Sequence, residues 1–78
     1  MDKQDYQKLS KQVYSYLLSL THNASLAEEL TQETFYQAMK TSSKYDGSCK
    51  ATTWLCGIAK RVLYKYYHKH PLLEKMDD

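Results

Sequence analysis

The sequence contains few residues that interrupt helices, and it lacks a long apolar run. Only 2 of its 78 residues are Gly and only 1 is Pro, so helix ends must be set mainly by polar capping residues. No apolar segment is long enough to span a membrane or to form a signal peptide. We therefore expect a cytoplasmic protein without membrane insertion.

Cysteine is also scarce. The two cysteines, Cys49 and Cys56, cannot build a disulfide framework, and their separation is neither a zinc-knuckle nor a redox spacing. We expect reduced, structural thiols. Hydrophobic residues at 42% and charged residues at 26% are typical of a folded, soluble chain. A length of 78 residues is enough for one small domain of modest stability.

The positive charge is concentrated in one stretch. Residues 44–70 hold 6 of the 11 Lys and Arg against a single acid, Asp46, which gives a local net charge of +5. Residues 1–43 carry −1 and residues 71–78 carry −2, so the overall +2 conceals a strong asymmetry. A basic field beside several Tyr and one Trp is suited to neutralising phosphates and to stacking on unpaired bases.

Apolar residues recur at spacings of three and four, which predicts helices with one buried face. The first helix is predicted at about residues 4–21, with a buried face formed by Tyr6, Leu9, Val13, Tyr16, Leu17 and Leu20. The second, at about residues 25–41, starts at a capping box in which Ser25 and Glu28 each satisfy the other's backbone amide. Its buried stripe is formed by Leu26, Leu30, Thr34 and Ala38, with Phe35 and Met39 beside it.

A third helix is predicted at about residues 50–69, between the turn signal Asp46-Gly47 and Pro71. Its buried residues are predicted to be Trp54, Leu55, Ile58, Ala59, Val62 and Tyr66. The chain therefore reads as an all-α, compact three-helix bundle.

Two exposed surfaces of these helices could carry function. On the second helix, acids and amides with one Tyr share a face, and either solvation or a binding partner would explain it. That face comprises Glu29, Gln32, Glu33 and Tyr36. On the third helix, Lys60, Tyr64 and Tyr67 form one row, and Arg61, Lys65 and His68 form another. The aromatic candidates for base stacking are Tyr45, Trp54, Tyr64 and Tyr67.

The sequence offers little support for an enzyme. It shows no nucleophile with a paired base, no Gly-rich phosphate loop and no cluster of carboxylates. The three histidines and two cysteines are distributed over different predicted elements and lack ligand spacing, so we expect neither a metal nor another cofactor. These histidines are His22, His68 and His70.

Three segments together resemble region 2 of the bacterial extracytoplasmic-function (ECF) sigma factors, which belong to the sigma-70 family. They are S-L-A-E-E-L-T-Q-E-T-F-Y-Q-A at residues 25–38, Y-D-G at residues 45–47 and T-W-L-C-G-I-A-K-R at residues 53–61. The resemblance extends from about Val13 to Tyr67. Nothing resembles the family's region 4, so we expect a single region 2 domain over residues 1–78 that is part of a longer protein.

The resemblance implies two partners. In the family, the second helix docks on the clamp coiled coil of the β′ subunit of the RNA polymerase core, which assigns polymerase contact to Glu29, Gln32, Glu33 and Tyr36. The loop at Tyr45 to Ala51 would capture an unpaired non-template base of the promoter minus-ten element, and the third helix would bind phosphates and help to open the duplex. The implied DNA-binding residues are Tyr45, Asp46, Gly47, Lys50, Ala51, Trp54, Lys60, Arg61, Tyr64 and Lys65. Many members are also held inactive by an anti-sigma protein.

The chain departs from the family pattern around the third helix. Ala51 stands where a large apolar residue is usual, Thr52 replaces a common Arg, and Arg61 often corresponds to Asn. Cys56-Gly57 stands where an aromatic residue and an Arg are frequent, and a Gly inside a helix costs about 1 kcal/mol relative to Ala. The identity of the captured base therefore does not carry over.

Two other functions remain open from the sequence. The first is a helical protein–protein adaptor without DNA binding, in which the third helix merely packs. The second is a reader of double-stranded DNA of the helix-turn-helix type, although the loop before Lys50 is longer than the tight turn of that motif.

Overall fold

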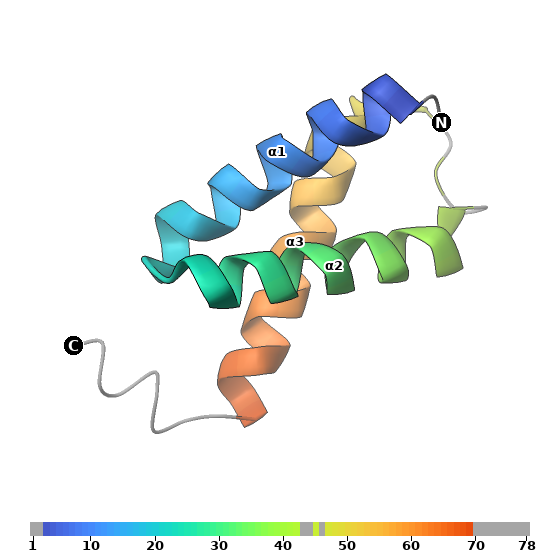
Figure 1. The fold of residues 1–78 in the computed structure, drawn as a ribbon. Helices are drawn as coiled ribbons and strands as arrows, with labels where there is room; N and C mark the ends of the chain where they lie inside the picture. Colours follow the sequence, from blue (N-terminus) through green and yellow to red (C-terminus); the bar gives the residue numbers. More distant parts are fainter. Residues whose placement is uncertain (1–2, 43–44, 46, 70–78) are drawn as a thin grey trace.

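The computed structural model describes residues 3–42, 45 and 47–69, and this part of the chain forms three helices. They are α1 (Lys3–Thr21), α2 (Ala24–Lys40) and α3 (Ala51–Lys69). Figure 1 shows α1 and α2 side by side and antiparallel, with α3 crossing both, and each helix packs on the other two. The predicted all-α three-helix bundle is confirmed, and every described helix end lies within one residue of its predicted position.

The reversal between α1 and α2 takes only two residues. His22 adopts a left-handed conformation with φ 53°, and its amide donates to the carbonyl of Leu18 at 2.8 Å, which closes the last turn of α1. Asn23 is extended and caps α2, because its Oδ1 accepts a hydrogen bond from the amide of Leu26 at 3.1 Å. The predicted cap at Ser25 is therefore wrong, since the helix has already begun at Ala24.

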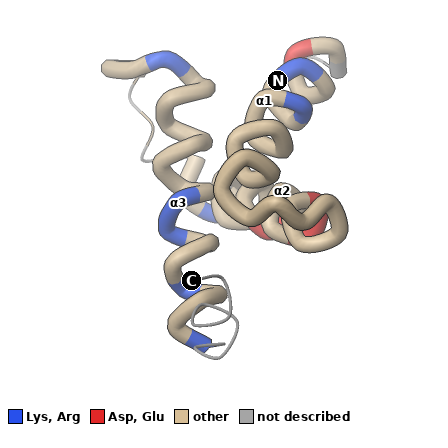
Figure 2. Tube along the Cα trace, turned by 90° about the vertical axis from the view of Figure 1, so that its left-hand side faces the viewer, with Lys and Arg blue, Asp and Glu red and all other residues tan. Residues whose placement is uncertain are grey.

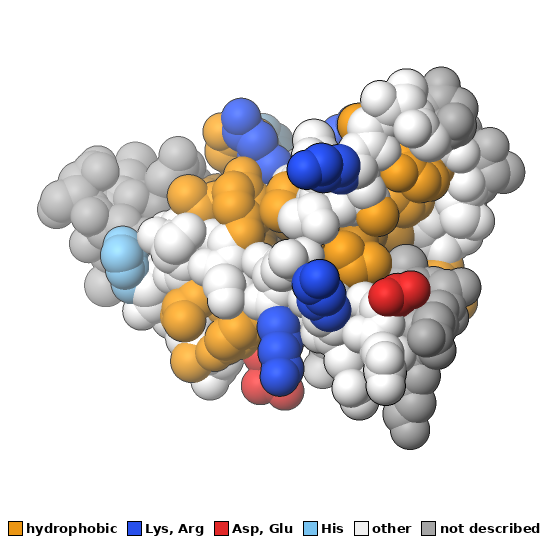
Figure 3. Space-filling view, turned by 90° about the horizontal axis from the view of Figure 1, so that it is seen from above, with side chains coloured by type: hydrophobic (Ala, Val, Ile, Leu, Met, Phe, Trp, Pro, Cys, Tyr) orange, Lys and Arg blue, Asp and Glu red, His pale blue; other side chains and the backbone are white. Residues whose placement is uncertain are grey.

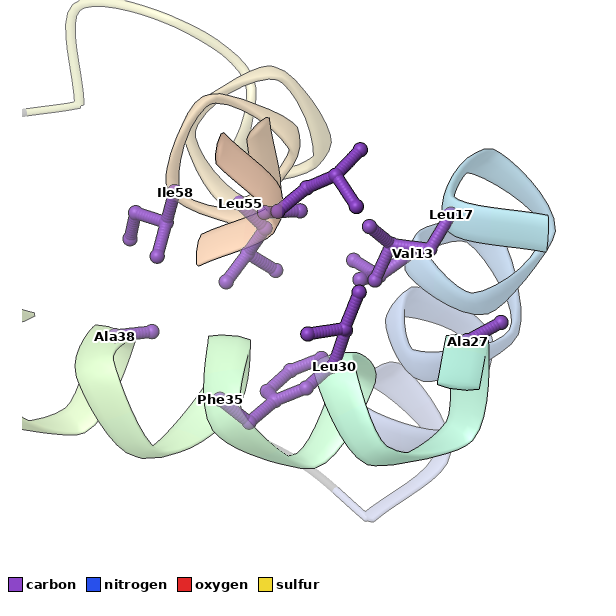
Figure 4. Close-up of a cluster of buried hydrophobic side chains, with 10 residues drawn as sticks. Val13, Leu17, Ala27, Leu30, Phe35, Ala38, Leu55 and Ile58 are labelled. Atoms are coloured by element: carbon purple, nitrogen blue, oxygen red, sulfur yellow. The ribbon is translucent and has the colours of Figure 1, made fainter. Parts of the chain in front are cut away.

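One cluster of buried side chains joins the three helices (Figure 4). Its members are Val13, Leu17, Ala27, Leu30, Phe35, Ala38, Leu55, Ile58, Ala59 and Leu63. Two buried threonines also face inward, and their hydroxyls donate to carbonyls one turn earlier: Thr31 to Ala27 at 2.6 Å and Thr34 to Leu30 at 2.7 Å. These bonds satisfy polar groups that burial would otherwise leave unpaired.

Several residues predicted to be buried are exposed. Met39 is 77% exposed, because it lies in the last turn of α2, and Figure 1 shows this end of α2 extending beyond its crossing with α3. Tyr6 and Leu20 lie near the two ends of α1 and are 48% and 45% exposed, although the ring of Tyr6 packs on Phe35 at 4.9 Å.

On α3, two residues that were not predicted to be buried belong to the core or pack against it. Leu63 is buried, and Tyr67, predicted to lie in an exposed row, is half-buried against the core. The cause is that α3 contacts both α1 and α2, so its buried arc is wider than one stripe.

No membrane-spanning helix is present in residues 3–42, 45 and 47–69. None of the three helices combines the length and the apolar character that such a segment requires.

The two glycines provide a test of backbone conformation. A Cβ added at either position would meet no atom within 4 Å, but Gly47 has φ +81° whereas Gly57 is helical. We expect Gly57→Ala to raise the free energy of unfolding by up to about 1 kcal/mol. Gly47→Ala should lower it by about 1 kcal/mol, because L residues are strained at positive φ. Urea denaturation followed by circular dichroism measures both, and changes of the same sign would contradict this account.

Candidate functional site

The four predicted polymerase-contact residues lie together on one exposed face of α2. Glu29, Gln32, Glu33 and Tyr36 are all exposed, with Tyr36 at 56%. The side-chain Nε2 of Gln37 donates to Glu33 Oε1 at 3.1 Å, and Lys40 Nζ lies 5.3 Å from the centroid of the Tyr36 ring. These contacts orient side chains without covering them, so the face is free to meet a partner.

The same face forms one wall of an open groove of about 720 Å³ between α2 and the C-terminal half of α3, which we call the α2–α3 groove. Its α3 wall is basic and consists of Arg61, Lys65 and Lys69. Apolar floor residues are Leu30, Ile58, Val62 and Tyr66. The groove therefore has an apolar floor between walls of opposite charge.

A second site lies at the start of α3. The Tyr45 ring stacks on Trp54, with centroids 4.8 Å apart and an interplanar angle of 23°, and the Tyr45 hydroxyl donates to the carbonyl of Cys49. Trp54 is half-buried and also packs against the core. A base that reaches this pair must therefore stack on an outer ring face or displace Tyr45. Asp46, another predicted DNA contact, lies outside the described residues.

The exposed side of α3 is basic from Lys60 to Lys69. Figure 2 shows blue segments and no red ones along this helix, because its 19 residues include Lys60, Arg61, Lys65 and Lys69 but no acid. Lys60 Nζ lies 5.7 Å from the centroid of the Tyr64 ring, a cation–π contact that keeps both groups on one exposed row. In the view from above, Lys and Arg side chains lie among hydrophobic ones (Figure 3).

The structure thus divides the predicted DNA-binding residues. Tyr45 and Trp54 lie together at the start of α3, whereas Lys60 and Tyr64 lie farther along its exposed side. Lys50 is exposed and Ala51 is half-buried. Arg61 and Lys65 instead line the α2–α3 groove opposite the acidic face of α2.

The roles of two residues were not predicted from the sequence. Lys69 continues the spacing of four from Arg61 and Lys65, a signal that could have placed it on the groove wall. Thr52 Oγ1 donates to Gln12 Oε1 at 3.0 Å and so joins the start of α3 to α1, a contact that no local pattern announces.

The described residues show no metal site, and one of the two thiols has lowered reactivity. No group of three or more His, Cys, Asp or Glu side chains within 3–42, 45 and 47–69 could hold a metal ion. Both cysteines are free, with Cys49 exposed and Cys56 partly buried. Burial raises the pKa of the Cys56 thiol, which lowers its thiolate fraction and hence its reactivity.

Comparison with protein families identifies the fold's relatives. The family model for sigma-70 region 2 matches residues 6–71, which includes nearly all of the three helices. The chain belongs to the sigma-70 region 2 family. The resemblance noted in the three motif segments is confirmed.

Three curated proteins are similar to this region 2 domain. The ECF RNA polymerase sigma factor SigM of Bacillus subtilis (strain 168) is 42% identical over 65 residues, which cover 83% of this chain. The RNA polymerase sigma factors YlaC of the same strain and HrpL of Pseudomonas syringae pv. syringae are 28% and 27% identical, each over 82% of this chain. The chain spans only 39%, 37% and 36% of the three relatives. No solved structure matches significantly.

Trp54 should contribute to the stability of this region 2 domain. We expect Trp54→Ala to lower the free energy of unfolding by about 2 kcal/mol, less than for a fully buried aromatic because the ring is only half-buried. Tyr64→Ala serves as the control, since Tyr64 is 60% exposed and should change stability by less than about 0.5 kcal/mol. Urea denaturation followed by circular dichroism would show equal effects if Trp54 were not part of the core.

Proposed function

We propose that this region 2 domain acts in transcription initiation by binding core RNA polymerase and capturing an unpaired base of the promoter minus-ten element. The acidic face of α2 binds the clamp coiled coil of the β′ subunit. The loop from Tyr45 to Ala51 and the exposed side of α3 bind the non-template single strand. The proposal rests above all on one observation: the acidic face of α2 lines the α2–α3 groove, whereas the pairs Tyr45–Trp54 and Lys60–Tyr64 lie outside that groove. It is supported by relatives named as RNA polymerase sigma factors.

The α2 face suits a basic protein partner. Glu29 and Glu33 are four residues apart and therefore project from the same side of the helix, and both are exposed. Tyr36 adds a large ring that can lose its remaining exposed area at low cost in side-chain entropy. Opposite charges across such an interface speed association and exclude partners of the wrong sign.

The start of α3 suits a single strand of DNA. Lys50 and Lys60 can neutralise phosphates, while the stacked Tyr45–Trp54 pair offers an aromatic surface for an extruded base. Extruding a base costs a few kcal/mol, which stacking and phosphate contacts can offset. An anti-sigma protein that covered this surface and the face of α2 would block both activities.

Reversing a charge on the α2 face should strongly weaken polymerase binding. Glu33→Lys would place a like charge against the basic partner, and we expect at least a tenfold loss of affinity for Bacillus subtilis core polymerase, measured by fluorescence anisotropy of the labelled domain. Glu28→Lys is the matched control, because Glu28 is exposed on the same helix but does not line the groove. Equal affinity of Glu33→Lys and the parent would contradict the assignment of α2.

Removing a charge from α3 should weaken binding to every single strand. Lys60→Ala is expected to reduce the salt-dependence slope by about 0.7 for each phosphate that the lysine neutralises, without changing the preference for minus-ten over scrambled sequence. Quenching of Trp54, the single Trp in the chain, reports the binding.

Lys8→Ala, which removes the same charge from the exposed surface of α1, is the control and should leave the slope unchanged. Absence of single-strand binding by the parent domain would contradict the proposed DNA binding and favour the adaptor.

A further inference from the structure

The α2–α3 groove brings together residues that the sequence assigned to different partners. Its α2 wall carries the polymerase candidates Glu29 and Glu33, and its α3 wall carries Arg61 and Lys65, which were assigned to DNA. We propose that the groove receives one α-helix of RNA polymerase, with basic side chains facing α2 and acidic side chains facing α3. Lys65 then binds protein and not DNA. This inference rests on the proposed function, because it takes polymerase as the partner.

The form of the groove suits a helix. It is open to solvent and about 720 Å³ in volume, and its floor includes the half-buried Val62 and Tyr66 between the two charged walls. An amphipathic helix binds in such a groove by placing an apolar stripe on the floor and its flanking polar residues against the walls. Polar side chains on the two flanks of the incoming helix then face α2 and α3.

The charges on the two walls of the α2–α3 groove determine which kind of ligand can bind there. No ion pair joins the walls among the described residues, and the carboxylate of Glu33 accepts from Gln37 on its own helix. Both walls therefore keep their charge for a partner. A phosphate backbone in the groove would approach Glu29 and Glu33, and a purely basic helix would approach Lys65 and Lys69. A helix that carries both signs is the occupant that meets attraction on each side.

The rest of α3 remains available to DNA. Lys60 does not line the groove, and five residues along a helix correspond to a rotation of roughly 140°, so Lys60 and Lys65 point to different sides. One helix thus offers one lysine to each partner. These two exposed lysines form a matched pair of the same residue type on the same element.

Charge reversal at the matched pair tests the inference. Lys65→Glu should lower the affinity for core polymerase at least tenfold, whereas Lys60→Glu should leave it within threefold of the parent. For a single strand of DNA the order reverses, and Lys60→Glu should reduce affinity more than Lys65→Glu does. Circular dichroism verifies folding, and Lys65→Gln, which only removes the charge, should show a smaller reduction of polymerase affinity in the same direction.

The double variant Glu33→Lys/Lys65→Glu keeps the parent's net charge but exchanges one charge between the two walls. We expect it to bind polymerase no better than either single variant. Recovery of the parent's affinity would show that total charge and not the polarity of the groove governs binding, and would overturn the inference. So would unchanged polymerase affinity of Lys65→Glu alongside weakened binding by Glu33→Lys. If Glu33→Lys binds polymerase as tightly as the parent, the assignment of the α2 face in the proposed function is contradicted, independently of the groove.

Discussion

The packing of α3 across both α1 and α2 is the constraint on which the rest of the molecule depends. Leu55 and Ala59 of α3 and Val13 and Leu17 of α1 are fully buried in one cluster. At this chain length a single core supplies little surplus stability, so the same few contacts must both hold the fold and set the crossing of the helices. Both candidate surfaces take their positions from that crossing.

Because of this crossing, the two ends of α3 have different surroundings. Near its start, the Tyr45–Trp54 stack and the hydrogen bond from Thr52 to Gln12 tie it to the preceding loop and to α1. Its C-terminal half diverges from α2 and leaves the open groove. A helix with basic residues on every exposed side can therefore present some of them to DNA and others to a protein that also contacts α2. Thr52, which replaces a common Arg of the family, serves the fold in this chain.

Local sequence patterns were sufficient to predict the positions of the three helices and the protein family. Spacings of three and four mark the extent of an amphipathic helix, and the helix ends were predicted to within one residue. The motif around Gln32 and Glu33 correctly indicated sigma-70 region 2. The cap was misplaced because Asn23 and Ser25 are both good capping residues, and the left-handed His22 selects Asn23.

What the sequence by itself determined was therefore the class, the three helices and the residue types available on each face, because these follow from neighbours along the chain. Only the tertiary structure decided which exposed residues share a surface. Met39 is exposed and Leu63 is buried because of where the helices cross, and Lys65 faces Glu29 and Glu33 for the same reason. The physical cause is that a helix pattern defines directions around one axis, whereas a groove depends on the relation between two axes.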